Sequence, residues 1–461
     1  MRIAVENVMA EVIEATPGEL EWLIKYIRCK VKKYGKIYQK GEAPETIVST
    51  GWFNMYEASS RKFAAGLVPV VAKGAALEGM QVAVEDDRAV PCTPDWPSVD
   101  VRWLRDYQLT AAQRASHGGR GLIKAPCAAG KTEISIALTR ALPIEWGFFV
   151  HRAELTTQAA KRFEIRTGEQ AGYFEAGRWR KGTSNFTVAT FQSITSSLRK
   201  GDVTTKAFLE ELQGVVIDES HAIAAETYYD VLMRMPNAYY RFGQSATPFH
   251  RGEKEKLLTL GALGPILYKI TMPRLVDVGA LSKPTIRMVE CYQNCWNGEA
   301  TFARVYKEGV VESVVRNKQI AEIAKIARPP AMIFVEKKAH GKELTTMINR
   351  RGVKAEFAWS GDRYDKLEKL KDGRIDVLVC TPIYQEGVDV PELKSVINAG
   401  GYSSAVASVQ RMGRGARLAG DDDNTFDVWD LYDRGQHWLE DHAEKRKLAL
   451  EAEGFPVEVL R

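Results

Sequence analysis

The sequence predicts an α/β protein with two tandem parallel-sheet lobes, preceded by a small α+β domain. Short apolar runs alternate with helix-length amphipathic stretches from about residue 103 to 282, and the same rhythm returns later in the chain. Buried strands separated by helices are typical of parallel sheets built from βαβ units. With 461 residues, the chain is long enough for about three domains of ordinary size.

Each expected strand is an apolar run that ends at a polar or glycine-rich segment. The runs in the first lobe are Leu122-Ile123, Phe148 to Val150, Val215 to Ile217 and Tyr240 to Phe242. Those in the second lobe are Met332 to Val335, Val377 to Val379 and Val396-Ile397. The first hundred residues instead hold a basic stretch, then a strand expected at Ile47 to Trp52 and an apolar helix expected around Leu67 to Leu77.

Two proline-containing segments mark the expected domain boundaries. Three prolines punctuate a linker from Pro91 to Ser98, and the residue before Pro284 is biased away from helix. We therefore expect a small N-terminal domain at residues 1–95, a first lobe at 96–282 and a second lobe at 283–461.

Composition and charge favour a soluble cytoplasmic protein. Hydrophobic residues make up 45% of the chain and charged residues 27%, and the net charge of +5 slightly favours polyanionic partners. The first ten residues lack a signal-peptide pattern, and the longest apolar stretches are far too short to span a membrane. The seven His and six Cys show no zinc-site spacing, so we expect reduced thiols.

The strongest single motif follows the first expected strand and precedes a helix, the context that a phosphate-binding loop requires. Lys131 would reach the β and γ phosphates of ATP, and Thr132 would ligate Mg²⁺. Alanines stand where this loop usually carries glycine, which predicts a stiffer loop. The ATP-binding residues expected here are Ala125, Pro126, Cys127, Ala128, Ala129, Gly130, Lys131 and Thr132.

A second motif delivers two adjacent carboxylates to the end of a buried strand, where α/β sheets bind ligands. Asp218 would hold Mg²⁺, and Glu219 would position or deprotonate the attacking water. The pair stands after Lys131 in the same lobe, so it predicts catalytic residues of ATP hydrolysis.

With these two motifs, four further segments fall in the order found in superfamily-two helicases, which the chain resembles from about residue 103 to 418. They are Leu104 to Gln108, Ser245 to Pro248, Thr381 with Glu386 to Pro391, and Gln410 to Arg417. The resemblance implies two RecA-like lobes that hydrolyse ATP between them. It also implies that Arg105 and Gln108 bind adenine, and that Gln410, Arg414 and Arg417 act catalytically from the second lobe.

Arginines supplied across a cleft stabilise charge on the transferred phosphate, and such a finger is worth roughly 10³ to 10⁵ in rate in GTPases. The resemblance further implies a set of residues that couple hydrolysis to strand movement. These are Ser245, Ala246, Thr247, Gly387 and Asp389.

Two features indicate which group of superfamily-two helicases the chain resembles. Residues 218–221 read Asp-Glu-Ser-His, unlike DEAD-box RNA helicases, and Arg61 to Pro69 with Val82 to Asp86 are similar to the small N-terminal domain of phage UvsW-type helicases. This implies a helicase that unwinds or branch-migrates forks and Holliday junctions in replication, recombination or repair. We expect a monomer, in the host cytoplasm if phage-encoded, with replication or recombination proteins as candidate partners.

The resemblance also implies that DNA contacts both lobes through its phosphates, and we expect low sequence specificity. By matching position, the candidates are Arg152, Thr190, Gln192 and Thr381. Two basic segments with interleaved aromatics add Lys30, Lys32, Lys33, Arg178 and Arg180. Each segment has a plainer interpretation, as a solvated helix or hairpin for the first and an exposed turn for the second.

Three other functions remain open from the sequence. The protein could be a duplex translocase within a restriction or defence complex, an RNA helicase, or an ATP-gated module that anneals strands. The N-terminal 95 residues are the expected substrate-recognition, DNA-binding domain in the preferred interpretation.

Overall fold

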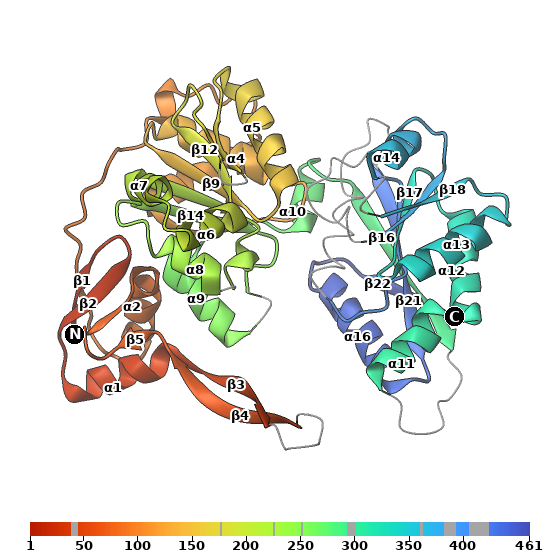
Figure 1. Cartoon of the computed structure of the whole chain (residues 1–461), viewed down its shortest axis with the longest axis horizontal. Coiled ribbons are helices and arrows are strands. Elements are labelled where there is room, and N and C mark those ends of the chain that lie inside the picture. Colours follow the sequence, from red (N-terminus) through yellow and green to blue (C-terminus); the bar gives the residue numbers. More distant parts are fainter. Residues whose placement is uncertain are drawn as a thin grey trace. The chain divides into compact units, whose positions relative to one another are not determined.

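A computed structural model describes residues 1–37, 45–175, 178–224, 226–249, 252–292, 301–359, 363–381, 393–404 and 424–461. The chain forms two compact units, one comprising Met1–Ala125 and Gly130–Lys269 and the other comprising Pro126–Ala129 and Ile270–Arg461 (Figure 1). None of the described helices combines the length and apolar character needed to cross a membrane.

The first unit begins with a small α+β group of elements. Its five-stranded sheet has the order β5-β6-β2-β1-β7. The strands are β1 (Arg2–Val5), β2 (Met9–Glu14), β5 (Tyr56–Glu57), β6 (Lys62–Ala64) and β7 (Ala83–Glu85). The helices are α1 (Pro17–Tyr26), the 3₁₀ turn η1 (Ala65–Leu67) and α2 (Val68–Leu77). Thr16 and Glu19 form a capping box that begins α1, and α2 confirms the apolar helix expected from the sequence.

A long antiparallel hairpin extends from these elements (Figure 1). It consists of β3 (Arg28–Ile37) and β4 (Glu45–Asn54), and β4 contains the strand expected at Ile47 to Trp52. Lys30, Lys32 and Lys33 of the basic segment therefore lie in a hairpin strand, and not in the helix that was the other structure considered for it.

The N-terminal elements share a hydrophobic core with α9 (Glu253–Leu263) of the first lobe. Phe63 and Val71 pack in the same buried cluster as Leu258 and Leu260. The backbones approach so closely that a Cβ atom at Gly66 would overlap the carbonyl oxygen of Leu260. This side of the N-terminal group is thus built against α9 rather than joined to it only by a linker.

The first lobe is a doubly wound sheet with the order β11-β10-β12-β9-β13-β14-β8-β15. All neighbouring strands pair in parallel except β10 and β11. The strands are β8 (Arg120–Lys124), β9 (Trp146–Val150), β10 (Gly172–Glu175), β11 (Arg178–Arg180), β12 (Phe186–Thr190), β13 (Gly214–Asp218), β14 (Tyr240–Ser245) and β15 (Ile266–Lys269). The four strands expected in this lobe are confirmed.

Helices flank this sheet and cover its apolar core. They are α3 (Asp106–Gly118), α4 (Lys131–Ala141), α5 (Ala153–Thr167), α6 (Phe191–Arg199), α7 (Val203–Glu211), α8 (Glu226–Leu232) and α9, with 3₁₀ turns η2 (Trp96–Ser98) and η3 (Ser220–Ala224). The proline-rich segment before α3 packs against the lobe, because Asp95 N donates to Ala141 O over 2.9 Å and the Tyr240 hydroxyl donates to Cys92 O over 2.6 Å.

The second unit carries a wholly parallel seven-stranded sheet in the order β18-β19-β17-β20-β21-β16-β22. The strands are β16 (Lys283–Tyr292), β17 (Ala331–Phe334), β18 (Ala355–Ala358), β19 (Val377–Cys380), β20 (Ser395–Asn398), β21 (Thr425–Arg434) and β22 (Val457–Leu460). The helices are α10 (Met272–Asp277), α11 (Phe302–Tyr306), the π-helical turn η4 (Lys307–Val311), α12 (Val314–Ile326), α13 (Lys338–Asn349), α14 (Arg363–Lys371) and α16 (His437–Glu451). Two parallel-sheet lobes therefore follow a small α+β group, which confirms the predicted fold class; the bounds of the three domains remain predictions.

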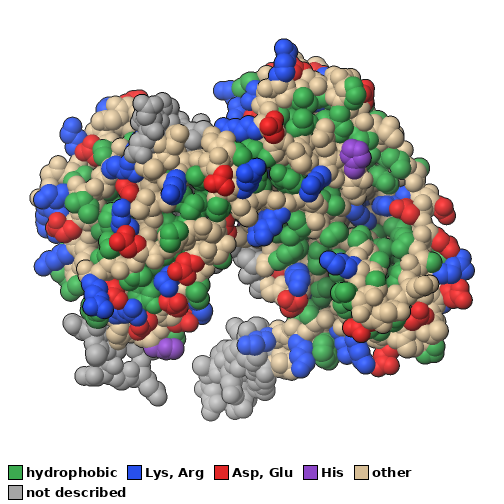
Figure 2. All heavy atoms as spheres, turned by 180° about the vertical axis from the view of Figure 1, so that it is seen from behind, with side chains coloured by type: hydrophobic (Ala, Val, Ile, Leu, Met, Phe, Trp, Pro, Cys, Tyr) green, Lys and Arg blue, Asp and Glu red, His purple; other side chains and the backbone are tan. Residues whose placement is uncertain are grey.

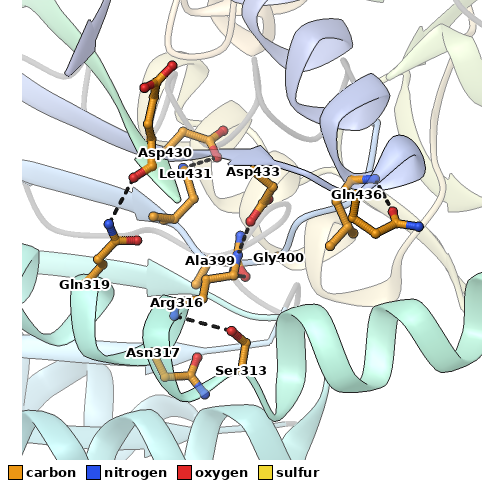
Figure 3. Close-up of polar contacts among 12 residues, drawn as sticks. Ser313, Arg316, Asn317, Gln319, Ala399, Gly400, Asp430, Leu431, Asp433 and Gln436 are labelled. Atoms are coloured by element: carbon orange, nitrogen blue, oxygen red, sulfur yellow. Dashed lines mark hydrogen bonds and ion pairs between the residues drawn. The ribbon is translucent and has the colours of Figure 1, made fainter. Parts of the chain in front are cut away.

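A buried ionic network holds the centre of the second unit (Figure 3). Arg316 of α12 contacts Asp433 of β21 over 2.9 Å, and neither side chain has any exposed surface. Arg446 of α16 contacts Asp430 over 3.1 Å, again with almost no exposure. Because each buried charge has an opposite partner, the network ties two helices to the central strand β21.

We expect Arg316→Met to lower the free energy of unfolding by about 3–5 kcal/mol. The substitution removes the 2.9 Å contact with Arg316 while the Asp433 carboxylate stays buried. Urea unfolding followed by tryptophan fluorescence measures this loss. The matched control is Lys445→Met, which breaks the exposed Lys445–Asp441 pair and should leave the unfolding curve almost unchanged. Equal shifts in both variants would contradict a special role for the buried pair.

Candidate active site

The loop expected to bind phosphate joins β8 to α4, which is the position that the sequence predicts. Ala128 and Gly130 both adopt left-handed backbone conformations, with φ of 64° and 74°. This conformation costs an alanine about 1–2 kcal/mol relative to its preferred regions. At the start of the loop, Ala125 N donates to Ser245 O over 3.2 Å, so the loop is anchored on the neighbouring strand β14.

Gln108 lies directly against this loop. It is 5% exposed, and its Oε1 accepts a hydrogen bond from Arg105 N over 2.9 Å at the start of α3. A Cβ atom at position 130 would collide with Gln108 Nε2, so only glycine leaves room for this amide. The structure therefore places Arg105 and Gln108, the expected adenine-binding residues, beside the loop.

Lys131 and Glu219 form an ion pair at the carboxyl edge of the sheet. Lys131 Nζ lies 2.9 Å from Glu219 Oε1, and the two side chains are only 10% and 11% exposed. The pair joins the first residue of α4 to the residue that follows β13. In this arrangement the lysine expected to hold phosphate and the carboxylate expected to orient water neutralise one another.

His221 continues this chain of contacts to the Ser-Ala-Thr segment. Its Nδ1 lies 3.2 Å from Glu219 Oε2 and 3.2 Å from Ser245 Oγ. Ser245 Oγ also accepts a hydrogen bond from Thr247 N over 3.1 Å. A continuous path of polar contacts therefore runs from Lys131 through Glu219 and His221 to Ser245.

The two carboxylates have different electrostatic surroundings. Desolvation, and then the charge of Glu219, raise the pKa of Asp218 above its usual range. Burial also disfavours the charged form of Glu219, but Lys131 and His221 outweigh it and hold the Glu219 pKa well below its usual range. The site therefore keeps Glu219 ionised, while Asp218 would gain most from a cation placed beside it.

A Mg²⁺ ion fits this donor set if the phosphates of ATP complete it. Among the described residues, no group of three or more His, Cys, Asp or Glu side chains could hold a metal ion by itself. Asp218 and Thr132 would supply one carboxylate and one hydroxyl, which is the small protein share that Mg²⁺ takes at nucleotide sites.

His221 has no role that the sequence alone predicts. The contact that links His221 to the Ser-Ala-Thr segment is made with Ser245, which is 24 residues away in the chain. Strand β13 alone predicts only that His221 follows the two carboxylates. Five predicted site residues, Gly387, Asp389, Gln410, Arg414 and Arg417, lie outside the described residues.

The candidate DNA contacts of the lobes differ in exposure. Gln192 is exposed, and its Nε2 donates to His151 O over 2.7 Å. Thr190 is 4% exposed, and its hydroxyl accepts a hydrogen bond from Ser193 N to begin α6. Arg152 is the N-cap residue that precedes α5, and Thr381 directly follows β19 with 9% exposure. Their roles as DNA contacts remain predictions.

The N-terminal hairpin displays a basic and aromatic surface. The Arg28 guanidinium lies 4.2 Å from the centroid of the Trp52 ring, and Lys30 Nζ lies 5.6 Å from it. Trp52 is 49% exposed although it is a large aromatic residue. Lys30 and Lys32 are exposed on the same strand, whereas the side chain of Lys33 lies outside the described residues.

The predicted turn around Arg178 is wrong. Residues 178–180 form strand β11, which pairs antiparallel with β10. Trp179 packs against Phe174 and Phe208, with ring centroids 4.4 Å and 4.3 Å apart, so its partly buried indole lies against the lobe's core. Arg180 is exposed, and the side chain of Arg178 lies outside the described residues.

Net charge does not locate the DNA path. On the face shown in Figure 2, Lys and Arg side chains are interspersed with Asp, Glu and apolar ones. Local clusters of cations, such as the one around Trp52, therefore indicate possible DNA contacts better than the net charge of +5 does.

We expect Gly130→Ala to weaken ATP binding roughly tenfold, because the new Cβ would displace Gln108 from its place beside the loop. Titration with a fluorescent ATP analogue measures the dissociation constant. Gly79→Ala is the matched control, since Gly79 has the same φ of 74° but no atom within 4 Å of the added Cβ. Equal affinities of the two variants would refute the contact with Gln108 as the cause.

Two family models match the chain. Residues 102–250 match the model described as "Type III restriction enzyme, res subunit", and residues 316–419 match "Helicase conserved C-terminal domain". The matches fall in the first and second lobe respectively, and together they cover more than half of the 461 residues.

Two relatives extend across both lobes. One, named as a helicase, from Sulfolobus islandicus filamentous virus (isolate Iceland/Hveragerdi), is 27% identical over 351 residues, which are 68% of this chain and 62% of the relative. The DNA 3'-5' translocase XPB2 of Sulfurisphaera tokodaii is 23% identical over 352 residues, covering 68% of this chain and 78% of the relative. The similarity to the viral relative thus spans less than two thirds of that protein.

Solved structures share the architecture. The type ISP restriction-modification enzyme LlaBIII bound to DNA has a TM-score of 0.58 at 15% identity, covering 82% of this chain and 33% of that chain. T4 UvsW covers 100% of this chain and 99% of its own at 17% identity, but its TM-score of 0.45 is too low to support an argument. With the two family matches, the relatives and the path from Lys131 to Ser245, the chain belongs to the superfamily-two helicases, ATP-dependent enzymes with two RecA-like lobes.

Proposed function

We propose that this protein is an ATP-dependent DNA helicase or translocase that unwinds or branch-migrates branched DNA. The observation that carries the proposal is the polar path from Lys131 through Glu219 and His221 to Ser245. It links the residues expected to bind and hydrolyse ATP with the segment that superfamily-two helicases use to couple hydrolysis to strand movement.

The path supports a specific order of events. When ATP binds, Lys131 exchanges its contact with Glu219 for the β and γ phosphates. Glu219, now released, orients a water molecule and accepts its proton as the water oxygen attacks the γ-phosphorus. The bond from the γ-phosphorus to the bridging oxygen breaks, which yields ADP and phosphate. Because His221 touches both Glu219 and Ser245, it would carry the change in Glu219 to β14.

DNA is the favoured polymer because several relatives are named for acting on it. They include the XPB2 translocase described above, and LlaBIII shares the fold in a DNA-bound structure. The exposed hairpin with Arg28, Lys30 and Trp52 supplies cations and an aromatic face, which suits contact with a nucleic-acid backbone and bases. Branched DNA is the proposed substrate on the basis of the UvsW-type motifs in the N-terminal segment.

A duplex translocase of a restriction system is the second candidate. It is favoured by the description of the family model that matches residues 102–250 and by the fold shared with LlaBIII. Both functions use the same ATP site, so they differ only in the DNA that stimulates it.

The rate of ATP hydrolysis without nucleic acid, and with single-stranded DNA, linear duplex, a fork, a four-way junction or RNA, tests the proposal. We expect the fork and junction to stimulate hydrolysis most. Lys131→Ala should lose at least about a hundredfold in turnover with every polymer, because it removes a phosphate contact made in the transition state. Equal stimulation by linear duplex would favour the translocase, and a response to RNA alone would overturn the DNA assignment.

We expect Lys30→Gln with Lys32→Gln to weaken binding of a fork about three- to tenfold while binding of ATP is unchanged, because two exposed cations leave the hairpin. Fluorescence anisotropy with a labelled fork measures this. Removal of the whole N-terminal segment is a poor substitute, since it would expose Leu258 and Leu260 of α9. Unchanged fork affinity would remove the hairpin from the substrate site.

A further inference from the structure

Lys254, the second residue of α9, lies where three segments of the first unit meet. Its Nζ is 4.9 Å from the centroid of the Phe53 ring at the base of the hairpin. The same ammonium group forms an ion pair with the carboxylate of Glu226, the first residue of α8. Helix α8 follows the expected catalytic carboxylates, and α9 follows the Ser-Ala-Thr segment. Lys254 therefore joins both helices to the hairpin.

The base of the hairpin presents two different faces, because successive side chains of a strand point to opposite sides. On one face, Phe53 packs against the cluster shared with α9, and Cys29, its partner across the hairpin, is 8% exposed. On the other face lies the exposed Trp52 ring with the Arg28 and Lys30 cations over it. A movement of Phe53 would thus move the surface that is proposed to contact DNA.

The last residue of α9 packs close to the ATP site. A Cβ atom at Gly243 of β14 would lie 2.4 Å from Leu263 Cδ1 of α9 and 2.8 Å from Ser220 Cβ. Ser220 begins the turn η3, and Ser245, where the polar path ends, lies two residues beyond Gly243 on β14. Helix α9 therefore contacts the strand of the Ser-Ala-Thr segment at one end and the hairpin at the other.

Between these ends, α9 is packed tightly against the N-terminal elements. A Cβ atom at Gly261 would lie 2.8 Å from Met55 Cε, and one at Gly66 would lie 2.2 Å from the carbonyl oxygen of Leu260. Close-packed interiors have low compressibility and transmit strain. A shift of α9 must therefore displace the elements that carry the hairpin.

We propose that Lys254 is a positioning residue that couples the ATP site to the DNA-binding face of the hairpin. The inference rests on the proposed DNA-dependent function and adds a route by which nucleotide and DNA affect each other's binding. In this route, release of Glu219 from Lys131 shifts the strand at Gly243, and α9 carries the shift. The ammonium group of Lys254 then makes the base of the hairpin follow, through its contact with Phe53.

A coupling of this kind is reciprocal, because ATP changes the affinity for DNA by the same factor by which DNA changes the affinity for ATP. The factor is measured as the ratio of the dissociation constants of a labelled fork without and with a non-hydrolysable ATP analogue, by fluorescence anisotropy. A cation–π contact at an exposed site is worth roughly a factor of two to five in an equilibrium constant. We therefore expect Lys254→Met to bring the coupling factor about two- to fivefold closer to one.

Two affinities separate this role from a merely structural one. Fork affinity without nucleotide and analogue affinity without DNA should both stay within about twofold in Lys254→Met, because the residue belongs to neither proposed binding site. Lys254→Arg should keep the coupling, since a guanidinium group also forms cation–π contacts and ion pairs.

The matched control is Lys256→Met, which removes the same charge from the same helix. Lys256 Nζ lies 3.2 Å from Glu253 Oε2, so this ion pair is internal to α9 and does not reach the hairpin. Melting curves confirm that each variant is folded.

Loss of coupling in Lys254→Met, with Lys254→Arg and the control unchanged, supports the proposal. A coupling factor of one in the unaltered protein, an unchanged factor in Lys254→Met, or the same loss in the control would overturn it while the proposed function stands. Fork binding weakened equally with and without nucleotide would also overturn it, in favour of a structural role. If the unaltered protein bound no fork, the proposed function would fall together with the inference.

Discussion

Parallel alignment of three neighbouring strands is the constraint on which the active site depends. In the first sheet, Asp218 of β13 is paired with Gln244 of β14, and Ser245 is paired with Lys124 of β8. The three strands therefore end at one edge, and the segments that follow them meet there. A shift of one residue in either pairing would turn the strand ends to the opposite face and separate Lys131, Glu219 and Ser245.

Within that frame, the site rests on competition for one ammonium group. Lys131 is paired with Glu219, and in the proposed mechanism the more highly charged phosphates of ATP would displace that carboxylate. Without this ion pair, Lys131 and Glu219 would be two buried, unpaired charges, and each would lower the free energy of unfolding. The same pair engages Glu219, so in the proposed mechanism binding of ATP and release of this carboxylate would be one event.

The sequence predicts the strands and the phosphate loop well because uninterrupted apolar runs and a Gly-Lys-Thr segment are local signals. It fails at Arg178–Arg180, where charges around Trp179 suggest exposure. Contact with Phe174 of the paired strand and with Phe208, which comes from a later helix, explains why the indole is partly buried.

The link through His221 could not be predicted for a related reason. His221 meets Ser245 because strands β13 and β14 lie side by side in the folded sheet. Spacing along the chain carries no information about this contact.

The shared core between the N-terminal elements and α9 has a consequence for evolution. Helix α9 begins a few residues after the Ser-Ala-Thr segment. Its Leu258 and Leu260 pack in one buried cluster with side chains from the first seventy-one residues. A recombination event that exchanged the N-terminal elements for those of another helicase would leave this helix with a mismatched partner surface. We therefore expect the two regions to be inherited together, with substitutions in one matched by compensating substitutions in the other.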